Sequence, residues 1–514
     1  MRSGHFYTMI SAAPTRRTRP VILLGGRDLR DVTADAVEAI VMANDPDPAV
    51  FEFGASLARL RHVDDRTFIE VMTVDLLANH LGKVADWRKV EKDEDGKTKF
   101  VACYPDKTVI RDVLAELSRP LPRIDRIVTA PTFSEDGSLV DTEGYHPDAR
   151  IYLSLDPNLV MPPVSVTPPD TEVGSAKTLI TRVLLHDFPF VSESDLAHAV
   201  AGMFLPFVRA MITGPTPLHL ILAPVKGTGK TLLSEAITHP AAGRVGVSTE
   251  ARNEDEWRKR IGAWLASGPP VISIDNLKNK LDSAALSAVL TEELWVDRLL
   301  GRNDKTIRYP NQALWIATGN GVTLSDELTR RTIPINLDAE VEHPYLRDTE
   351  TFRFPDLRGW MRQQRGLLIW ACTTLIQRWI SDGRPLGTAT IGSYESWAKT
   401  MGGILGVVEI DGFLTNLAEF YASSDPETVA WNALIASWRE TYQGTAVRPG
   451  ELLVQYDTLA DDFLALGDKS DRLRASSLGN KLLAQRNRIF AGYQLVLIDN
   501  NQGGNRWRLQ PKGS

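Results

Sequence analysis

The sequence predicts an α/β fold with a parallel sheet in its central domain. A mixed α/β domain precedes this domain, and a helical region and a C-terminal helix-plus-hairpin module follow it. Three observations support the prediction. Apolar runs typical of buried strands alternate with helix-forming stretches between residues 218 and 337, the pattern of parallel sheets. A segment with four prolines, 161–170, separates this region from the preceding one. After residue 346, apolar residues recur at helical spacing.

Length and composition indicate a multidomain globular protein. The chain has 514 residues, of which 43% are hydrophobic and 24% charged, close to soluble averages. No apolar run is long enough for a membrane span, and the arginine-containing N-terminus lacks the apolar core of a secretory signal. Cys103 and Cys372 suggest neither a disulfide framework nor a zinc site. We therefore expect a cytoplasmic protein without a membrane partner.

The expected domain boundaries follow from these changes in composition. They are a disordered tail at 1–19, a mixed α/β domain at 20–160, a linker at 161–176, an α/β domain at 177–345, a helical region at 346–425 and a C-terminal module at 426–514. Within the first domain, residues 20–24 and 50–53 are expected as strands and 33–44 as a helix. The charge-rich stretch 91–99 is expected as a solvated loop, and no paired-carboxylate signature of a polymerase is evident.

A phosphate-binding loop is the strongest local signal. The segment PVKGTGKT, 224–231, follows an apolar strand and precedes a helix-forming stretch. Gly227 and Gly229 would let backbone N–H groups turn toward phosphates at a helix N-terminus. Lys230 would reach the β- and γ-phosphates of ATP, and the Thr231 hydroxyl would bind Mg²⁺. The residues expected at the nucleotide are Pro224, Val225, Lys226, Gly227, Thr228, Gly229, Lys230, Thr231 and Leu232, with Pro224 in place of the usual first glycine.

Two later strands end in polar residues that fit the same chemistry. The run 269–276 ends in Asp275 and Asn276, and an acidic residue on a strand beside the P-loop strand would hold Mg²⁺. Asn276 stands where a glutamate often polarises the attacking water, so the catalytic base stays open. Another acid such as Glu292 or Glu293 is one alternative, and slow hydrolysis is the other. The run 312–320 ends in Asn320, which would bond the attacking water or the γ-phosphate.

Basic residues around these strands suggest contacts beyond one subunit. Arg330 and Arg331 precede the strand 332–337 and would reach the γ-phosphate of a neighbouring subunit as an arginine finger. Residues 295–310 read as a β-hairpin with Arg302 and Lys305 near its tip. Such a hairpin would grip single-stranded DNA in a channel, although a structural hairpin is the open alternative.

Together, the stretches PVKGTGKT, VISIDN, WVDRLLG, LWIATGN and ELTRRTIPINL resemble the AAA+ ATPases of superfamily 3 helicases, such as the modules of phage, plasmid and poxvirus primase-helicases. They span residues 218–337. The resemblance implies a hexameric homo-oligomer with ATP sites between subunits, translocating on single-stranded DNA. Pro224 and Asn276 depart from the family's commonest patterns.

The C-terminal module supports a DNA partner independently. An amphipathic helix at 476–486 precedes strands at 493–498 and 505–509, an order that resembles a winged helix. From residue 470 onward the chain has eight basic residues and two acidic ones, so double-stranded DNA is a second expected partner. The residues expected to contact it are Lys481, Arg486, Arg506 and Arg508.

Three functions remain open at the level of sequence. The first is an ATP-driven helicase in the replication of a phage, prophage or other mobile element. The second is a DNA-binding initiator, loader or regulatory ATPase without unwinding activity, which Asn276 favours. The third is a primase-helicase with synthesis activity in residues 1–160.

Overall fold

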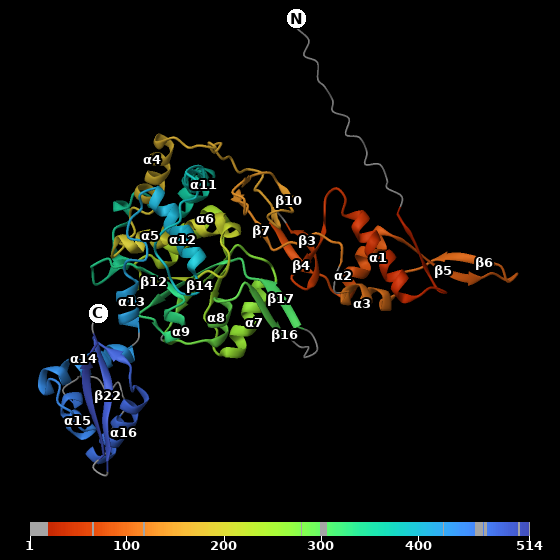
Figure 1. Ribbon diagram of the computed structural model, residues 1–514. Coiled ribbons are helices and arrows are strands. Elements are labelled where there is room, and N and C mark those ends of the chain that lie inside the picture. Colours follow the sequence, from red (N-terminus) through yellow and green to blue (C-terminus); the bar gives the residue numbers. More distant parts are fainter. Residues whose placement is uncertain are drawn as a thin grey trace, which may run out of the picture. The chain divides into compact units, whose positions relative to one another are not determined.

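Five parallel strands form the central sheet in the computed structural model (Figure 1). Across the sheet the order is β13 (Val247–Thr249), β14 (Val271–Leu277), β18 (Leu314–Asn320), β12 (Leu218–Ala223) and β20 (Thr332–Asn336). All neighbouring pairs are parallel, so the loops after β12, β14 and β18 lie together at the carboxyl ends of the strands. This confirms the parallel sheet predicted from the apolar runs.

The strand order differs from the sequence-based expectation at one point. Asp275 was expected on a strand beside the P-loop strand, but β18 lies between β12 and β14. Order along the chain does not determine order across a parallel sheet, because each crossover can skip a position. The consequence is that β18 runs between the P-loop and Asp275, and its last residue is Asn320.

The structure describes residues 19–63, 66–116, 119–278, 280–298, 306–424, 426–457, 466, 470–501 and 504–512. The chain divides into two compact units. The first comprises Met1–Leu159, Lys259–Pro270 and Glu293–Ala313; the second comprises Val160–Arg258, Val271–Glu292 and Leu314–Ser514.

Two segments expected in the α/β domain, 259–270 and 293–313, thus pack with the first unit. The hairpin of β16 (Leu294–Arg298) and β17 (Thr306–Pro310) shows the reason. Tyr309 stacks on Phe53 with ring centroids 5.5 Å apart. A Cβ on Gly54 would lie 1.7 Å from the carbonyl oxygen of Arg308, so glycine permits the close approach. Such long-range packing leaves no periodic signal in the sequence.

In the first unit, an apolar core is formed by side chains from several strands and from the helices α1, α2 and α3. Its further elements are β1 (Val21–Leu24), α1 (Leu29–Ala43), β2 (Val50–Phe53), β3 (Ser56–Val63), β4 (Arg66–Val71), α2 (Val74–Val84), β5 (Asp86–Lys92), β6 (Thr98–Ala102), α3 (Lys107–Ala115), β7 (Arg126–Val128), β8 (Thr132–Phe133), β9 (Leu139–Val140), β10 (Gly144–His146) and β11 (Ile151–Leu153). The expected charged loop at 91–99 is partly wrong: residues 93–97 form an exposed turn, but 91–92 and 98–99 belong to β5 and β6, which pair as a hairpin reaching away from α1–α3 (Figure 1). Opposite charges face each other across the strands, as in Glu91 opposite Lys99.

Helices of the second unit cover the central sheet. Helix α5 (Glu193–Val208) and helix α6 (Lys230–Ala242) pack on it, and Ser192 with Asp195 forms the capping box of α5. The expected linker ends earlier than predicted, because α4 begins at Asp170 directly after Pro169. The other elements here are α4 (Asp170–Thr178), η1 (Leu179–Leu184), η2 (Arg209–Met211), β15 (Lys280–Leu281), α8 (Ala284–Val289), β19 (Thr323–Leu324), α9 (Asp326–Thr329), η3 (Pro344–Leu346), η4 (Thr349–Thr351), α10 (Leu357–Gln363), α11 (Arg365–Ser381), α12 (Glu395–Val407) and α13 (Leu417–Ser424), while α7 (Glu254–Leu265) spans the boundary between the units.

In the described residues after 425, three helices and a small sheet surround a tryptophan-rich core. The elements are α14 (Pro426–Tyr442), α15 (Pro449–Asp457), α16 (Asp471–Ala484), β21 (Ile489–Phe490), β22 (Tyr493–Asn501) and β23 (Gly504–Pro511). Helix α16 begins five residues before its predicted start and ends before Arg486. In the described part of the chain, no helix has the length and apolarity needed to cross a membrane.

Candidate nucleotide-binding site

The loop between β12 and α6 has the backbone geometry of a phosphate cradle. Gly227 and Gly229 have φ angles of +81° and +108°, values that favour glycine. Gly227 also lacks room for a side chain, because a Cβ there would lie 2.7 Å from the Cβ of Tyr345. Gly229 caps α6, whose first residue is Lys230. The loop therefore ends at a helix N-terminus, where backbone N–H groups favour anions.

A cavity of about 660 Å³ lies against this loop. Besides the loop it is lined by residues from the ends of β14 and β18. The lining residues are Lys226, Gly227, Gly229, Lys230, Thr231, Leu232, Asp275, Asn276, Leu277, Lys278, Thr318 and Asn320. Pro224, Val225 and Thr228, which were also expected at the nucleotide, do not line it. The Thr228 hydroxyl instead donates to the carbonyl of Val225 at 2.7 Å, closing the loop on itself.

Lys230 lines this cavity and is held by a residue of β18. Its side chain is mostly buried, the residue being 8% exposed, and its Nζ donates a 2.5 Å hydrogen bond to Oδ1 of Asn320. Burial lowers the pKa of the Lys230 ammonium, and the negative charge of Asp275 opposes that shift. An ammonium held in a partly buried site attracts phosphate more strongly than one in bulk water. The geometry thus places a partly buried cation where a triphosphate would bind.

Thr231 and Asp275 form the candidate magnesium site. The Thr231 hydroxyl donates to Oδ1 of Asp275 at 3.0 Å, and the Thr318 hydroxyl donates to the same oxygen. Mg²⁺ in nucleotide sites takes few protein oxygens, with phosphates and water completing its shell. A carboxylate oxygen and a hydroxyl in contact beside a phosphate cradle fit that requirement.

Asn276 has a conformation that explains its residue type. Its φ angle is +59°, and the pairing of β14 with β18 shifts register between Ile274 and Leu277. Asparagine tolerates the left-handed region better than most residues with a side chain. The backbone N–H of Asn276 donates to the Thr318 hydroxyl at 2.9 Å, which holds the bulge in place. Asn276 carries no proton-accepting carboxylate.

A carboxylate that the sequence analysis missed lies one strand away. Glu250 follows β13, whose last residue, Thr249, pairs with Asp275. Adjacent strands lie about 4.8 Å apart. The residue after Thr249, Glu250, therefore leaves β13 beside the residue after Asp275, which is Asn276. Its Oε2 accepts a hydrogen bond from the amide of Lys278 at 3.0 Å, and Lys278 lines the cavity. None of the carboxylates of Glu250, Glu292 and Glu293 lines that cavity itself, but Glu250 is bonded to a residue that does.

Arg330 and Arg331 lie at the amino-terminal ends of the strands, opposite to the P-loop. The Arg331 carbonyl accepts from the amide of Leu218, the first residue of β12, whereas the P-loop follows Ala223 at the other end. Five residue steps along a strand correspond to about 17 Å. Both arginines therefore lie away from the P-loop of their own chain. The two side chains differ. Arg330 is exposed, and its Nε donates to the Asp326 carbonyl at 3.3 Å. Arg331 is less exposed and bonds Ser287 Oγ at 2.7 Å and the Glu327 carbonyl at 2.9 Å.

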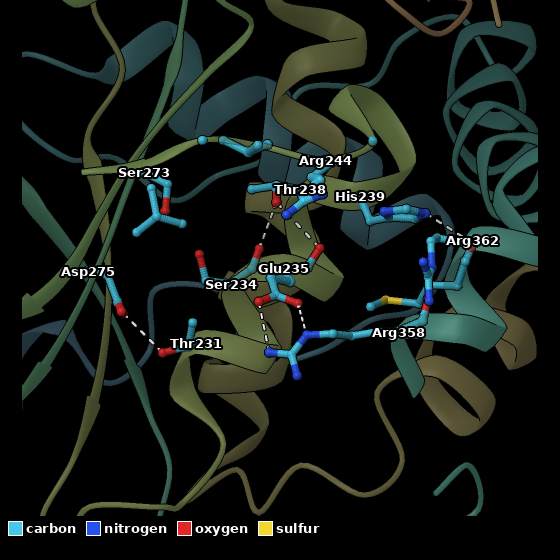
Figure 2. Close-up of a pocket in the computed structure, with 15 residues that line it drawn as sticks. Thr231, Ser234, Glu235, Thr238, His239, Arg244, Ser273, Asp275, Arg358 and Arg362 are labelled. Atoms are coloured by element: carbon cyan, nitrogen blue, oxygen red, sulfur yellow. Dashed lines mark hydrogen bonds and ion pairs between the residues drawn. The ribbon is translucent and has the colours of Figure 1, made fainter. Parts of the chain in front are cut away.

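A second cavity, of about 540 Å³, begins at Thr231 and Asp275 and continues along α6 (Figure 2). Figure 2 shows the hydroxyl of Thr231 directed at Asp275 and the guanidinium of Arg358 directed at Glu235. Arg358 donates to both carboxylate oxygens of Glu235, at 2.5 and 2.8 Å. This bidentate pair joins the helix after the P-loop to α10.

The expected DNA-contacting residues are only partly described. Arg302 and Lys305 lie outside the described residues, although both hairpin strands are described. Arg506 and Arg508 are exposed on β23 and alternate with the buried Trp507 and Leu509. Two further candidates follow on or after α16: Lys481, which is half-buried, and Arg486, which is exposed beyond the end of the helix.

No protein family and no curated protein matches this chain. Among solved structures, the A-form apo structure of the NrS-1 C-terminal region is 10% identical and covers 92% of this chain and 98% of its own, with a TM-score of 0.32. The active helicase SCCmec type IV Cch is 10% identical and covers 80% and 79%, with a TM-score of 0.31. The JCV helicase is 12% identical and covers 52% and 71%, with a TM-score of 0.21. Likenesses this weak assign no function.

Proposed function

We propose that the protein is an ATP-dependent DNA helicase or translocase that acts as a ring-shaped homo-oligomer, with a hexamer as the expected size. The observation that carries the proposal is the convergence of Lys230, Thr231, Asp275 and Asn320 on one cavity beside a glycine loop. Replication of a phage, prophage or other mobile element is the biological setting that the resemblance implies.

Each of these side chains has a distinct role in the proposed reaction. Lys230 binds the β- and γ-phosphates, and Asn320 orients the attacking water or the γ-phosphate. Mg²⁺ neutralises phosphate charge when it is bound, and Thr231 and Asp275 supply protein oxygens for it. We assign Glu250 as the general base that accepts the proton of the attacking water. Its position beside Asn276 supports this role, because a carboxylate there replaces the glutamate absent from residue 276.

The position of the arginines supports shared active sites. Because Arg330 and Arg331 lie a strand length from their own P-loop, the γ-phosphate that either can approach belongs to a neighbouring subunit. Arg330 is the better candidate, because it is exposed and its guanidinium bonds the Asp326 carbonyl at 3.3 Å, whereas that of Arg331 bonds both Ser287 and Glu327 at 2.7 and 2.9 Å. An arginine supplied by a neighbour stabilises charge on the transferred phosphoryl group.

The proposed DNA contacts involve two parts of the chain. The hairpin tip with Arg302 and Lys305 would contact single-stranded DNA in the ring. The C-terminal module would act as a winged helix, with Lys481 and Arg486 on or just after its helix and Arg506 and Arg508 on its hairpin. The exposure of both β23 arginines supports phosphate contact.

One observation favours a second function, a DNA-binding initiator or loader without unwinding activity. The strands of the β16–β17 hairpin are fixed on the first unit through Tyr309 and Phe53. A hairpin held at its base is less suited to the strokes that drive translocation.

A strand-displacement assay separates the two functions. We expect the wild type to release a labelled strand from a forked duplex with ATP and Mg²⁺, and the Lys230→Ala variant to release none. ATP hydrolysis and DNA binding without displacement, over a range of forks with either tail polarity, would contradict the helicase and favour the initiator or loader.

A further inference from the structure

A cavity of about 790 Å³ opens beside the two arginines. Its walls combine charge with apolar side chains, which are Ile391, Leu414, Leu417 and Tyr421. Ile391 and Leu417 are almost fully buried, so they form part of the packed wall of the cavity. A basic, apolar hollow of this size suits an acidic segment with exposed apolar side chains.

A segment of that chemistry lies on the P-loop of the same chain. Residues 338–350, which we name the rim segment, follow β20 and are fixed to the loop by two contacts. The backbone of Tyr345 lies 3.0 Å from the position of a Cβ on Gly227, and Arg347 Nη2 donates to the Thr228 carbonyl at 3.2 Å. The rim segment carries five exposed carboxylates, those of Asp338, Glu340, Glu342, Asp348 and Glu350.

The rim segment also exposes apolar side chains. Tyr345 is 62% exposed and Leu346 is 70% exposed. Contiguous exposed apolar residues beside a functional loop often mark a protein contact. The rim segment is fixed to the P-loop, and the cavity adjoins Arg330. The two surfaces therefore lie at opposite ends of the strands. One chain therefore cannot bring them together through a local movement.

We propose that the rim segment of one subunit docks into the arginine-lined cavity of the next subunit. The inference rests on the proposed function, in which Arg330 reaches a neighbour's nucleotide. For that to happen, the edge that carries Arg330 must face the neighbour's P-loop, and the rim segment lies on that loop. The contact joins two different surfaces of identical chains, and such a head-to-tail interface forms a ring when its rotation closes.

Disulfide cross-linking tests the contact directly. The starting protein is Cys103→Ser, which leaves Cys372 as the remaining cysteine, fully buried in α11. Leu346→Cys places a thiol on the rim segment, and Ala418→Cys places one at the cavity. With both substitutions, mild oxidation should give a ladder of linked subunits that a reductant dissolves. Each substitution alone should give no ladder, and neither should Ala418→Cys with Tyr104→Cys, at a residue that is 91% exposed in the first unit.

A charge test supports the cross-link without using cysteine. Glu342→Lys with Glu350→Lys reverses two rim charges and should lower the oligomer fraction at least several-fold at low salt, measured by sedimentation. Binding of ATP by the dissociated subunit should be retained, because neither side chain lines the nucleotide cavity. No ladder in a protein that forms oligomers, together with unchanged assembly of the charge variant, would overturn the inference.

The mixing of two inactive variants reports on the proposed function separately. If Arg330→Ala and Lys230→Ala subunits regain activity on mixing while no cross-link forms, the shared active site stands and the docking contact is wrong. If neither recovery nor cross-link occurs in mixed oligomers, both fail.

Discussion

Lys230 and Asn320, ninety residues apart in the chain, are joined by a 2.5 Å hydrogen bond between Nζ and Oδ1. The bond spans the carboxyl ends of β12 and β18, which are adjacent parallel strands with Ala223 opposite Asn320. The residue proposed to bind phosphate is therefore oriented by the residue expected to sense it. In the proposed reaction, Lys230 exchanges this amide oxygen for phosphate oxygens when ATP binds.

Asn320→Ala should slow ATP hydrolysis on the order of 10²-fold, because one oriented polar group beside the developing charge is lost. Binding of ATP should change little, since the glycine loop and Lys230 remain. Steady-state kinetics and titration with a fluorescent ATP analogue measure the two effects. A wild-type kcat would show that Asn320 only positions Lys230.

Glu250→Gln should lower kcat by about 10² to 10⁴-fold, because the amide cannot accept the proton of water. The matched control is Glu254→Gln, an isosteric change of a nearby carboxylate that bonds Ser283 and the amide of Ala285. That control should affect thermal stability more than kcat. Equal kcat values for Glu250→Gln and wild type would place the base elsewhere.

The sequence predicted the parts of this site that depend on local pattern. A strand, a glycine loop and a helix follow one another between residues 218 and 242, and the structure has β12, the loop and α6 there. Asp275 and Asn320 end apolar runs, and both line the same cavity as Lys230. These residues were recognisable because the carboxyl ends of parallel strands gather at one edge.

The rest depends on tertiary register, which the sequence does not display. Glu250 was missed because β13 is a three-residue, largely exposed strand, and its pairing with Asp275 exists only in the folded sheet. The attachment of the β16–β17 hairpin to the first unit depends on Tyr309 meeting Phe53, residues remote in the chain. The left-handed conformation of Asn276 likewise follows from a bulge between β14 and β18.

Arg330→Ala and Arg331→Ala should have different effects. Removal of the exposed Arg330 should lower kcat by about 10³-fold without changing the melting temperature, as expected for an arginine finger. Removal of Arg331 should cost about 1–2 kcal/mol of stability, because Ser287 and Glu327 lose a charged donor. Kinetics combined with thermal melts measure both. Full activity of Arg330→Ala would show that Arg330 is not the arginine finger. Either Arg331 then has that role or neither residue has it.

Acid should destabilise the second unit through His198. This side chain is fully buried; its Nε2 accepts from the Leu414 amide at 3.1 Å and its Nδ1 bonds the Pro334 carbonyl at 2.7 Å, so the ring is neutral. Burial lowers the pKa of His198 to about 4 from 6.5. The unfolded chain therefore binds more protons between these values, and the stabilisation present above pH 6.5 is lost as pH falls toward 4.

At pH 5, protonation of His198 in the unfolded chain lowers the free energy of unfolding by about 2 kcal/mol. Thermal melts at pH 7.5 and 5.0 should show a smaller difference for His198→Gln, which keeps a polar amide but cannot be protonated. The buried His219, whose pKa is lowered to about 3, should retain part of the effect. An identical pH response of the variant and the wild type would contradict the assignment to His198.

The central claim is that the cavity around Lys230 hydrolyses ATP, and ATP turnover by Lys230→Ala tests it most directly. Lys399→Ala is the control, since it removes an exposed lysine of α12 that does not line the nucleotide cavity. We expect turnover by Lys230→Ala to fall to background while Lys399→Ala keeps most of the wild-type rate. Wild-type turnover by folded Lys230→Ala protein would contradict the account.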